Sequence, residues 1–192
     1  IRALSMLARA ESILKKQFAS SMMLRVASDV ECRTLLLAAG GVRTLCFLAR
    51  ASHPRKVFKP AATAIHLMSM SAQCVPALLD AGAGAVLSAL ATSSDPDLRQ
   101  ECCKALADML ECTMESEGRA GIDGSSVNQS VNQSSTGIDG SSKVVDSILQ
   151  QGALGVFLSA AMAPDRPTQH QASRALRYVA KLSPLYARIL AR

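Results

Sequence analysis

Residues 81–90 read AGAGAVLSAL, and residues 39–48, which lie 42 positions earlier, read AGGVRTLCFL. Each stretch places a glycine after an alanine, with leucines five and eight residues beyond that glycine. Leucines three residues apart are typical of the buried side of a helix, and the glycine permits the positive φ of a sharp break before it. A pattern that returns at this interval predicts a repeated helical unit.

The apolar register continues through both copies and extends to two others. Pro54 and Pro96 each stand 14 residues after their glycine, and small apolar residues follow at 61–68 and 102–109. A third copy runs from 152 to 179, and an N-terminal copy from 4 to 26. Each unit reads as three helices: a short one that ends at the glycine, a second of about ten residues, and a longer third that begins near the proline.

These residues resemble the armadillo repeat family. The resemblance lies in the glycine turns and second helices at 40–48, 82–90 and 152–160, and in the third helices at 61–65, 102–106 and 172–176. It implies an all-α fold, a right-handed armadillo-type α-solenoid. HEAT repeats share the period but usually lack the short first helix marked by glycine.

The resemblance divides the chain into one armadillo-repeat domain, 1–192, interrupted by a long loop. The repeats cover 1–29, 30–71, 72–112 and 143–183, and a further unit starts at 184–192. Residues 113–142 are expected to be a flexible insert, because they contain GIDGSS and VNQS twice each and such polar sequence buries too little apolar surface to order. A partner-binding or modified segment is the alternative for this insert. No polar cap is visible at the C-terminal end, so we expect the chain to continue there or another subunit to cover it.

Composition narrows the classes of protein further. The chain is 49% apolar and 19% charged, which excludes a disordered chain, and 3% aromatic without Trp, which favours helices over a β-sandwich. No apolar run is expected to approach the ~18–20 residues of a membrane span. The six cysteines include no C-x-x-C pair and read as reduced core thiols, so the cytoplasm is the expected compartment, with nucleus, cilium, or an organelle after transit-peptide removal as alternatives.

No pattern of catalytic or metal-binding residues stands out. The three histidines lie far apart in sequence and outside known motifs, and Gly82 and Gly84 lack the Gly-Lys-Ser/Thr that a phosphate loop requires. We therefore expect no enzyme activity, no cofactor and no metal.

The family resemblance implies a concave groove lined by the third helices. Peptide-binding members carry a Trp and an Asn on that helix. The Trp position falls here on Thr63, Lys104 and Arg174, and the Asn position on Leu67, Asp108 and Tyr178. The missing Trp and Asn argue against an importin-like receptor for basic peptides. Cations and an aromatic side chain in the same groove favour an acidic or helical protein segment, with candidate residues Lys104, Arg174, Arg177 and Tyr178.

The leading functional hypothesis is a non-catalytic protein-interaction module, either a scaffold or a subunit of a larger assembly. It would bind a protein segment in the groove or through its open C-terminal repeat end. RNA binding through the basic flanks, residues 1–80 and 143–192, is a weaker alternative because residues 81–120 carry a net charge of −4. A third hypothesis makes the chain the regulatory region of a longer enzyme.

Overall fold

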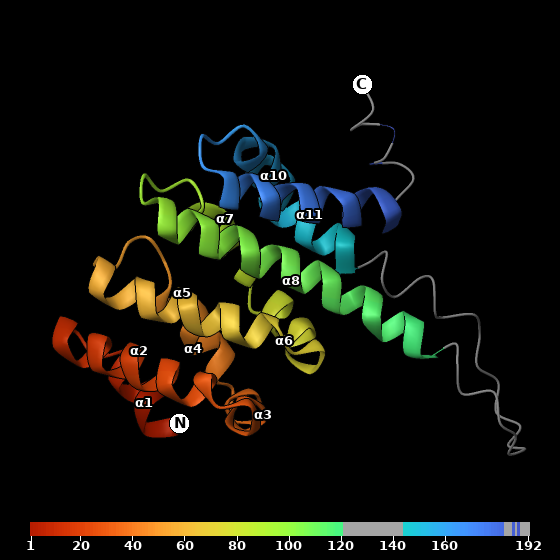
Figure 1. The fold of residues 1–192 in the computed structure, drawn as a ribbon. Helices are drawn as coiled ribbons and strands as arrows, with labels where there is room; N and C mark the ends of the chain where they lie inside the picture. Colours follow the sequence, from red (N-terminus) through yellow and green to blue (C-terminus); the bar gives the residue numbers. More distant parts are fainter. Residues whose placement is uncertain (121–143, 183–185, 187, 189–192) are drawn as a thin grey trace, which may run out of the picture.

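The computed structural model describes residues 1–120, 144–182, 186 and 188, and these residues form helices and turns without any strand (Figure 1). Residues 144–148 are also helical. The elements are α1 (Arg2–Ala8), α2 (Ile13–Ser28), α3 (Val30–Ala38), α4 (Gly41–Leu48), α5 (Arg55–Ser69), η1 (Ala72–Cys74), α6 (Val75–Asp80), α7 (Ala83–Leu90), α8 (Pro96–Ala120), η2 (Leu149–Ala153), α10 (Leu154–Ala161) and α11 (Arg166–Leu182).

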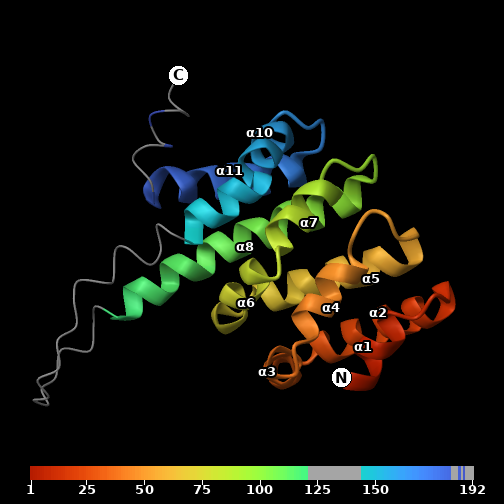
Figure 2. The ribbon, with the colours of Figure 1, turned by 180° about the vertical axis from the view of Figure 1, so that it is seen from behind.

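The third helices stack side by side in chain order. α2 packs on α5, α5 on α8 and α8 on α11, so they form one layer from the N-terminal to the C-terminal repeat (Figure 1). The second helices α1, α4, α7 and α10 lie behind this layer, where each packs on the third helix of its own unit (Figure 2). The predicted all-α solenoid is therefore confirmed.

The helix breaks occur at the three glycines that the sequence pattern singles out. Gly40, Gly82 and Gly152 have φ values of 68°, 76° and 94°, a region that other residues rarely adopt. Each glycine turns the chain between the first and second helix of a unit. The third-helix starts are also as expected: α8 begins at Pro96, and Asp165 Oδ2 accepts a hydrogen bond from Thr168 N–H (3.1 Å) at the start of α11.

The stretch expected to be a flexible insert begins with helix. α8 continues to Ala120, so residues 113–120 are helical and extend the third helix of that unit. The repeated GIDGSS and VNQS sequences lie outside the described residues. Of the expected further unit at 184–192, the structure describes Tyr186 and Arg188, both helical.

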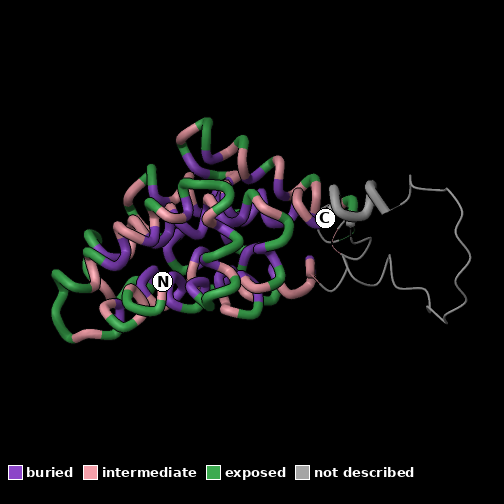
Figure 3. The backbone as a smooth tube through the Cα atoms, turned by 90° about the horizontal axis from the view of Figure 1, so that it is seen from below, coloured by how far each residue is buried: buried purple, intermediate pink, exposed green. Residues whose placement is uncertain are grey.

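Small and flexible apolar side chains fill the space between the layers. Alanine and leucine dominate the buried positions, with valine, cysteine and methionine next, and these positions follow the inner sides of the helices along the solenoid (Figure 3). All six cysteines lie in the described part of the chain and none is in a disulfide; Cys46, Cys74, Cys102 and Cys103 are buried. Small residues allow the helices to approach closely, which a core almost without aromatic rings requires.

One apolar stretch is longer than the sequence analysis expected. Val144–Ala161 has a mean hydropathy of 1.3 over 18 residues, enough by length and composition for a membrane span. The prediction that no apolar run approaches that length is therefore wrong. The stretch is not one straight helix, because the positive φ of Gly152 turns the chain within it. Phe157, beyond that turn, is fully buried in the core.

Candidate protein-binding face

The candidate site residues lie on three neighbouring third helices. Thr63 and Leu67 are on α5, Lys104 and Asp108 on α8, and Arg174, Arg177 and Tyr178 on α11. We call the surface formed by α2, α5, α8 and α11 the third-helix face. Arg177 is exposed and Asp108 is buried, while the other five candidates are half-buried.

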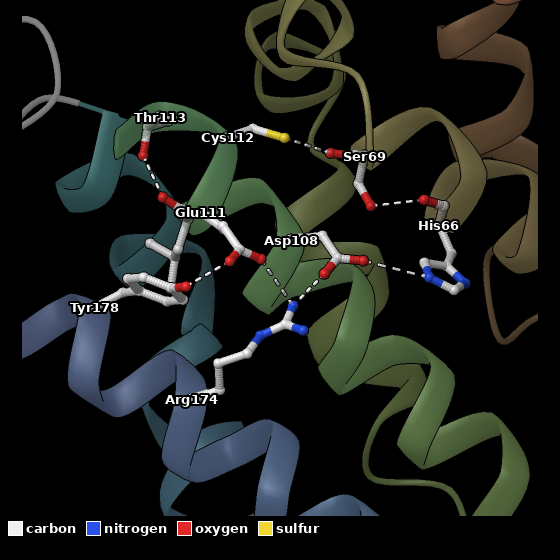
Figure 4. A network of polar contacts seen from close by, with 9 residues as sticks. His66, Ser69, Asp108, Glu111, Cys112, Thr113, Arg174 and Tyr178 are labelled. Carbon is white, nitrogen blue, oxygen red and sulfur yellow. Dashed lines mark hydrogen bonds and ion pairs between the residues drawn. The ribbon is translucent and has the colours of Figure 1, made fainter. Parts of the chain in front are cut away.

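Asp108 and Arg174 join the third helices of two successive repeats. The Arg174 guanidinium donates a hydrogen bond to Asp108 Oδ1, and its Nη2 lies 3.5 Å from Glu111 Oε2 (Figure 4). The Tyr178 hydroxyl donates to Glu111 Oε1 at 2.5 Å. Arg174 and Tyr178 are therefore engaged with α8 inside the chain, which fixes their orientation on the third-helix face.

His66 extends this network to α5, the third helix of the preceding repeat. Its Nε2 lies 3.4 Å from Asp108 Oδ2, and its Nδ1 lies 3.7 Å from Glu101 Oε1. Asp108 thus stands between His66 of α5 and Arg174 of α11 (Figure 4). We call His66, Glu101, Asp108, Glu111, Arg174 and Tyr178 the seam network.

Burial and charge act in opposite directions on the seam network. Burial lowers the pKa of His66, but the neighbouring carboxylates of Asp108 and Glu101 outweigh burial, and the pKa is raised. Burial raises the pKa of Asp108, but His66 and Arg174 outweigh it and hold this pKa below its usual range. Burial likewise raises the pKa of Glu101, and His66 and Thr63 more than compensate, so that it is lowered. The network therefore favours ionised carboxylates beside a protonated imidazole.

Sequence reasoning missed His66, Glu101 and Glu111 as parts of the site. Their signal was present in the repeat register, because His66 precedes Leu67, the residue that corresponds to Asp108 on the next third helix. Side chains of opposite charge at nearby, although not corresponding, register positions of successive third helices can meet across the seam between them. The insert hid this signal for α8 and α11, whose bonded residues Asp108 and Arg174 are 66 positions apart.

Two cations of the face remain available to a partner. Within the described part of the chain, neither Lys104 nor Arg177 forms an ion pair. Thr63, by contrast, donates its hydroxyl hydrogen bond to Lys59 O of its own helix at 3.2 Å. The face thus combines free cations with side chains that the fold already holds in place.

Among residues 1–120 and 144–182, no three His, Cys, Asp or Glu side chains lie together as metal ligands. A shallow hollow of about 160 Å³ beside the seam network is lined by Met70, Asp108, Glu111 and Cys112.

Similar solved structures carry the same arrangement of helices. No family model and no curated protein matches the sequence. An engineered protein superposes on 93% of this chain with a TM-score of 0.68 and 23% identity, and the chain spans 61% of that protein's length. Computationally designed armadillo repeat proteins for modular peptide recognition match 98% of the chain, with a TM-score of 0.55 and 16% identity over 86% of their own length. The chain has an armadillo repeat fold.

A second designed armadillo repeat protein was solved in complex with the peptide (KR)4. It matches 98% of the chain and 88% of its own length, with a TM-score of 0.54 and 16% identity. At these identities the likeness concerns the armadillo fold, whose third helices form the face described above.

Proposed function

We propose that this armadillo solenoid is a non-catalytic interaction module, a scaffold or a subunit of a larger assembly, that binds a protein segment on its third-helix face. The observation that carries the proposal is the continuous layer of α2, α5, α8 and α11, which presents half-buried polar and apolar side chains from successive repeats. Support comes from designed proteins of the same fold, which were made for peptide recognition.

The free charges of the face favour an acidic segment. Lys104 and Arg177 lack ion-pair partners in the described residues, whereas Asp108 is buried between His66 and Arg174. A carboxylate-bearing segment, extended or helical, would meet these two cations at the cost of little rearrangement. A basic segment would have to compete with Arg174 for Asp108 and Glu111.

Two peptides of equal length and opposite charge test this proposal. We expect a peptide of alternating Glu and Asp to bind at least ~10-fold more tightly than (KR)4 in fluorescence anisotropy at low salt. The double variant Lys104→Glu/Arg177→Glu should lose that preference. Arg43→Glu, which changes an exposed cation of α4, is the matched control and should leave binding unchanged.

Two results would contradict the proposal. If (KR)4 bound more tightly than the acidic peptide, the partner would have to be basic rather than acidic. If the double variant bound the acidic peptide as tightly as the unchanged chain does, the contact would lie outside the third-helix face. Single-stranded RNA is the third probe. Should it bind more tightly than either peptide, with an affinity that falls steeply as salt rises, the alternative of RNA binding would replace this one.

A further inference from the structure

α2 exposes an apolar stripe on one side. Leu14, Phe18 and Met22 follow one another at intervals of four residues, which places them on a single side of the helix. Leu14 is 76% exposed and Phe18 is 54% exposed, while Met22 is half-buried. Large apolar side chains that gather in this way, rather than singly, indicate an interaction surface.

The repeat register shows what this side of α2 is built to contact. Residues 19, 20, 23 and 27 of α2 are buried, and so are the residues 83 positions later on α8, 102, 103, 106 and 110. By the same register Phe18 corresponds to Glu101 and Arg25 to Asp108. On α8 these two positions touch His66 of the preceding third helix. The stripe therefore lies on the side of α2 that corresponds to the side of α8 on which α5, the preceding third helix, packs.

Charge indicates the chemistry of a helix that would fit there. Residues 1–28 contain five cations and one carboxylate, and Arg25, at the end of the stripe, is exposed without an ion pair among the described residues. A second copy of this chain would bring the wrong charge, because α11, its last third helix, carries four Arg or Lys residues and no carboxylate. Like charges brought together across an interface cost several kcal/mol.

We propose that α2 docks an amphipathic, acidic helix of a partner protein, which packs alongside α2 as α5 packs alongside α8. The apolar side of that helix covers Leu14, Phe18 and Met22, and a carboxylate on it pairs with Arg25. The stripe lies on α2, whereas Lys104 and Arg177 lie on α8 and α11, so this proposal stands or falls independently of the peptide site at those two cations.

The probe is a synthetic amphipathic peptide of ~18 residues, five helical turns, with leucines on one side and glutamates beside them. We expect it to bind the whole chain in anisotropy measurements and to gain helical circular dichroism on binding. Leu14→Ser/Phe18→Ser should weaken binding at least ~10-fold. Met162→Ser is the matched control, because Met162 is 86% exposed at the other end of the solenoid, and it should bind as the unchanged chain does.

A charge swap makes the test specific for a helix in this register. Arg25→Glu should weaken binding of the acidic peptide and strengthen binding of a peptide in which lysines replace the glutamates. Equal binding of both peptides to the unchanged chain would overturn the proposal. Loss of self-association in Leu14→Ser/Phe18→Ser would also overturn it, because a second copy of the chain would then be the occupant. Binding to phosphatidylserine vesicles that depends on the stripe, without binding of the peptide, would overturn it as well and would identify a lipid surface.

Discussion

Gln151 fills the space that a side chain on residue 84 would need. A Cβ at Gly84 would lie 2.6 Å from Gln151 Oε1 and 3.1 Å from Gln151 Cβ. That Oε1 accepts a hydrogen bond from Ala85 N–H (3.2 Å), and Gln151 Nε2 donates to Leu79 O (3.4 Å). One side chain from the turn at Gly152 therefore bridges the end of α6 and the start of α7 in the preceding repeat.

Gly84→Ala is expected to destabilise the fold by about 1 kcal/mol, because the new methyl group displaces Gln151 from its hydrogen bonds. Urea unfolding measures this change in the free energy of unfolding. In a Gln151→Ala background the same substitution should cost less, because the amide that the methyl group displaces is gone and only the 3.1 Å contact with the Cβ of residue 151 remains. Gly155→Ala is the control: its Cβ would meet nothing within 4 Å, and it should stabilise the fold by about 0.5–1 kcal/mol.

Asp108 and Arg174 should be strongly coupled in stability. Asp108→Asn is expected to cost about 1–3 kcal/mol, because it leaves the Arg174 guanidinium in a half-buried seam with a weaker acceptor. A double-mutant cycle with Arg174→Gln should give a coupling energy of about 1 kcal/mol or more. Arg177→Gln, an exposed position on the same helix, should change stability by less than about 0.5 kcal/mol. Additive effects of the two seam substitutions would contradict the contact.

The seam network should make stability depend on pH through His66. Its folded pKa is raised above the ordinary 6.5, so its contribution is fully present below about pH 6.5 and is lost as pH rises through the folded pKa. The pKa of Asp108 is lowered from 3.8, so its contribution is present above that value and lost as pH falls through the folded pKa. Unfolding free energies measured between about pH 5.5 and 8.5 should show the His66 component as a decline.

His66→Asn is the comparison that isolates this component. Burial, as the largest cause, lowers the pKa of His53, so His53 contributes a slope of opposite sign in both proteins. The difference between the two pH profiles therefore reports His66 alone. Parallel profiles would show that His66 does not exchange protons with a raised pKa in the fold.

The cysteines should differ in reactivity according to burial. Burial raises the pKa of Cys46 to about 12, and the pKa of Cys103 to about 11 against the opposing effect of Arg99. N-ethylmaleimide at neutral pH should therefore label the half-buried Cys32 and Cys112 before Cys46, Cys103 and the other buried thiols, as read by peptide mass spectrometry. In denaturant all six should react alike. Early labelling of Cys46 in the native protein would contradict the packing.

The repeat pattern was enough to predict the fold because glycine leaves an unusual mark in a helical sequence. Among the described residues, the glycines with positive φ are Gly40, Gly82 and Gly152, which are the three that open the repeated apolar pattern, and the apolar positions between them belong to the core. The spacing of the helices is the same in successive repeats even where the individual residues differ. The end of α8 was less predictable, since the apolar pattern stops while the helix continues to Ala120.

The helix that carries each candidate residue was predictable from the sequence, but the contacts of its side chain were not. The repeat register places Lys104, Arg174 and Tyr178 on the third helices, and the structure has them there. Which side chains pair across a seam depends on the rotation of one helix against the next, and a single sequence does not record that angle. Arg174 and Tyr178 therefore looked available for a partner, whereas both bind carboxylates of α8.

The insert separates residues along the chain that the solenoid brings together. Cys112 donates to Ser69 O across 43 residues, while Asp108 and Arg174 meet across 66. Because the entropy of closing a loop grows with the logarithm of its length, this difference amounts to only ~0.4 kcal/mol. It bears more on kinetics, since contacts distant in sequence form slowly. We therefore expect docking of α11 on α8 to be the step of folding that the insert delays most, with the first three repeats forming before the last one packs on them.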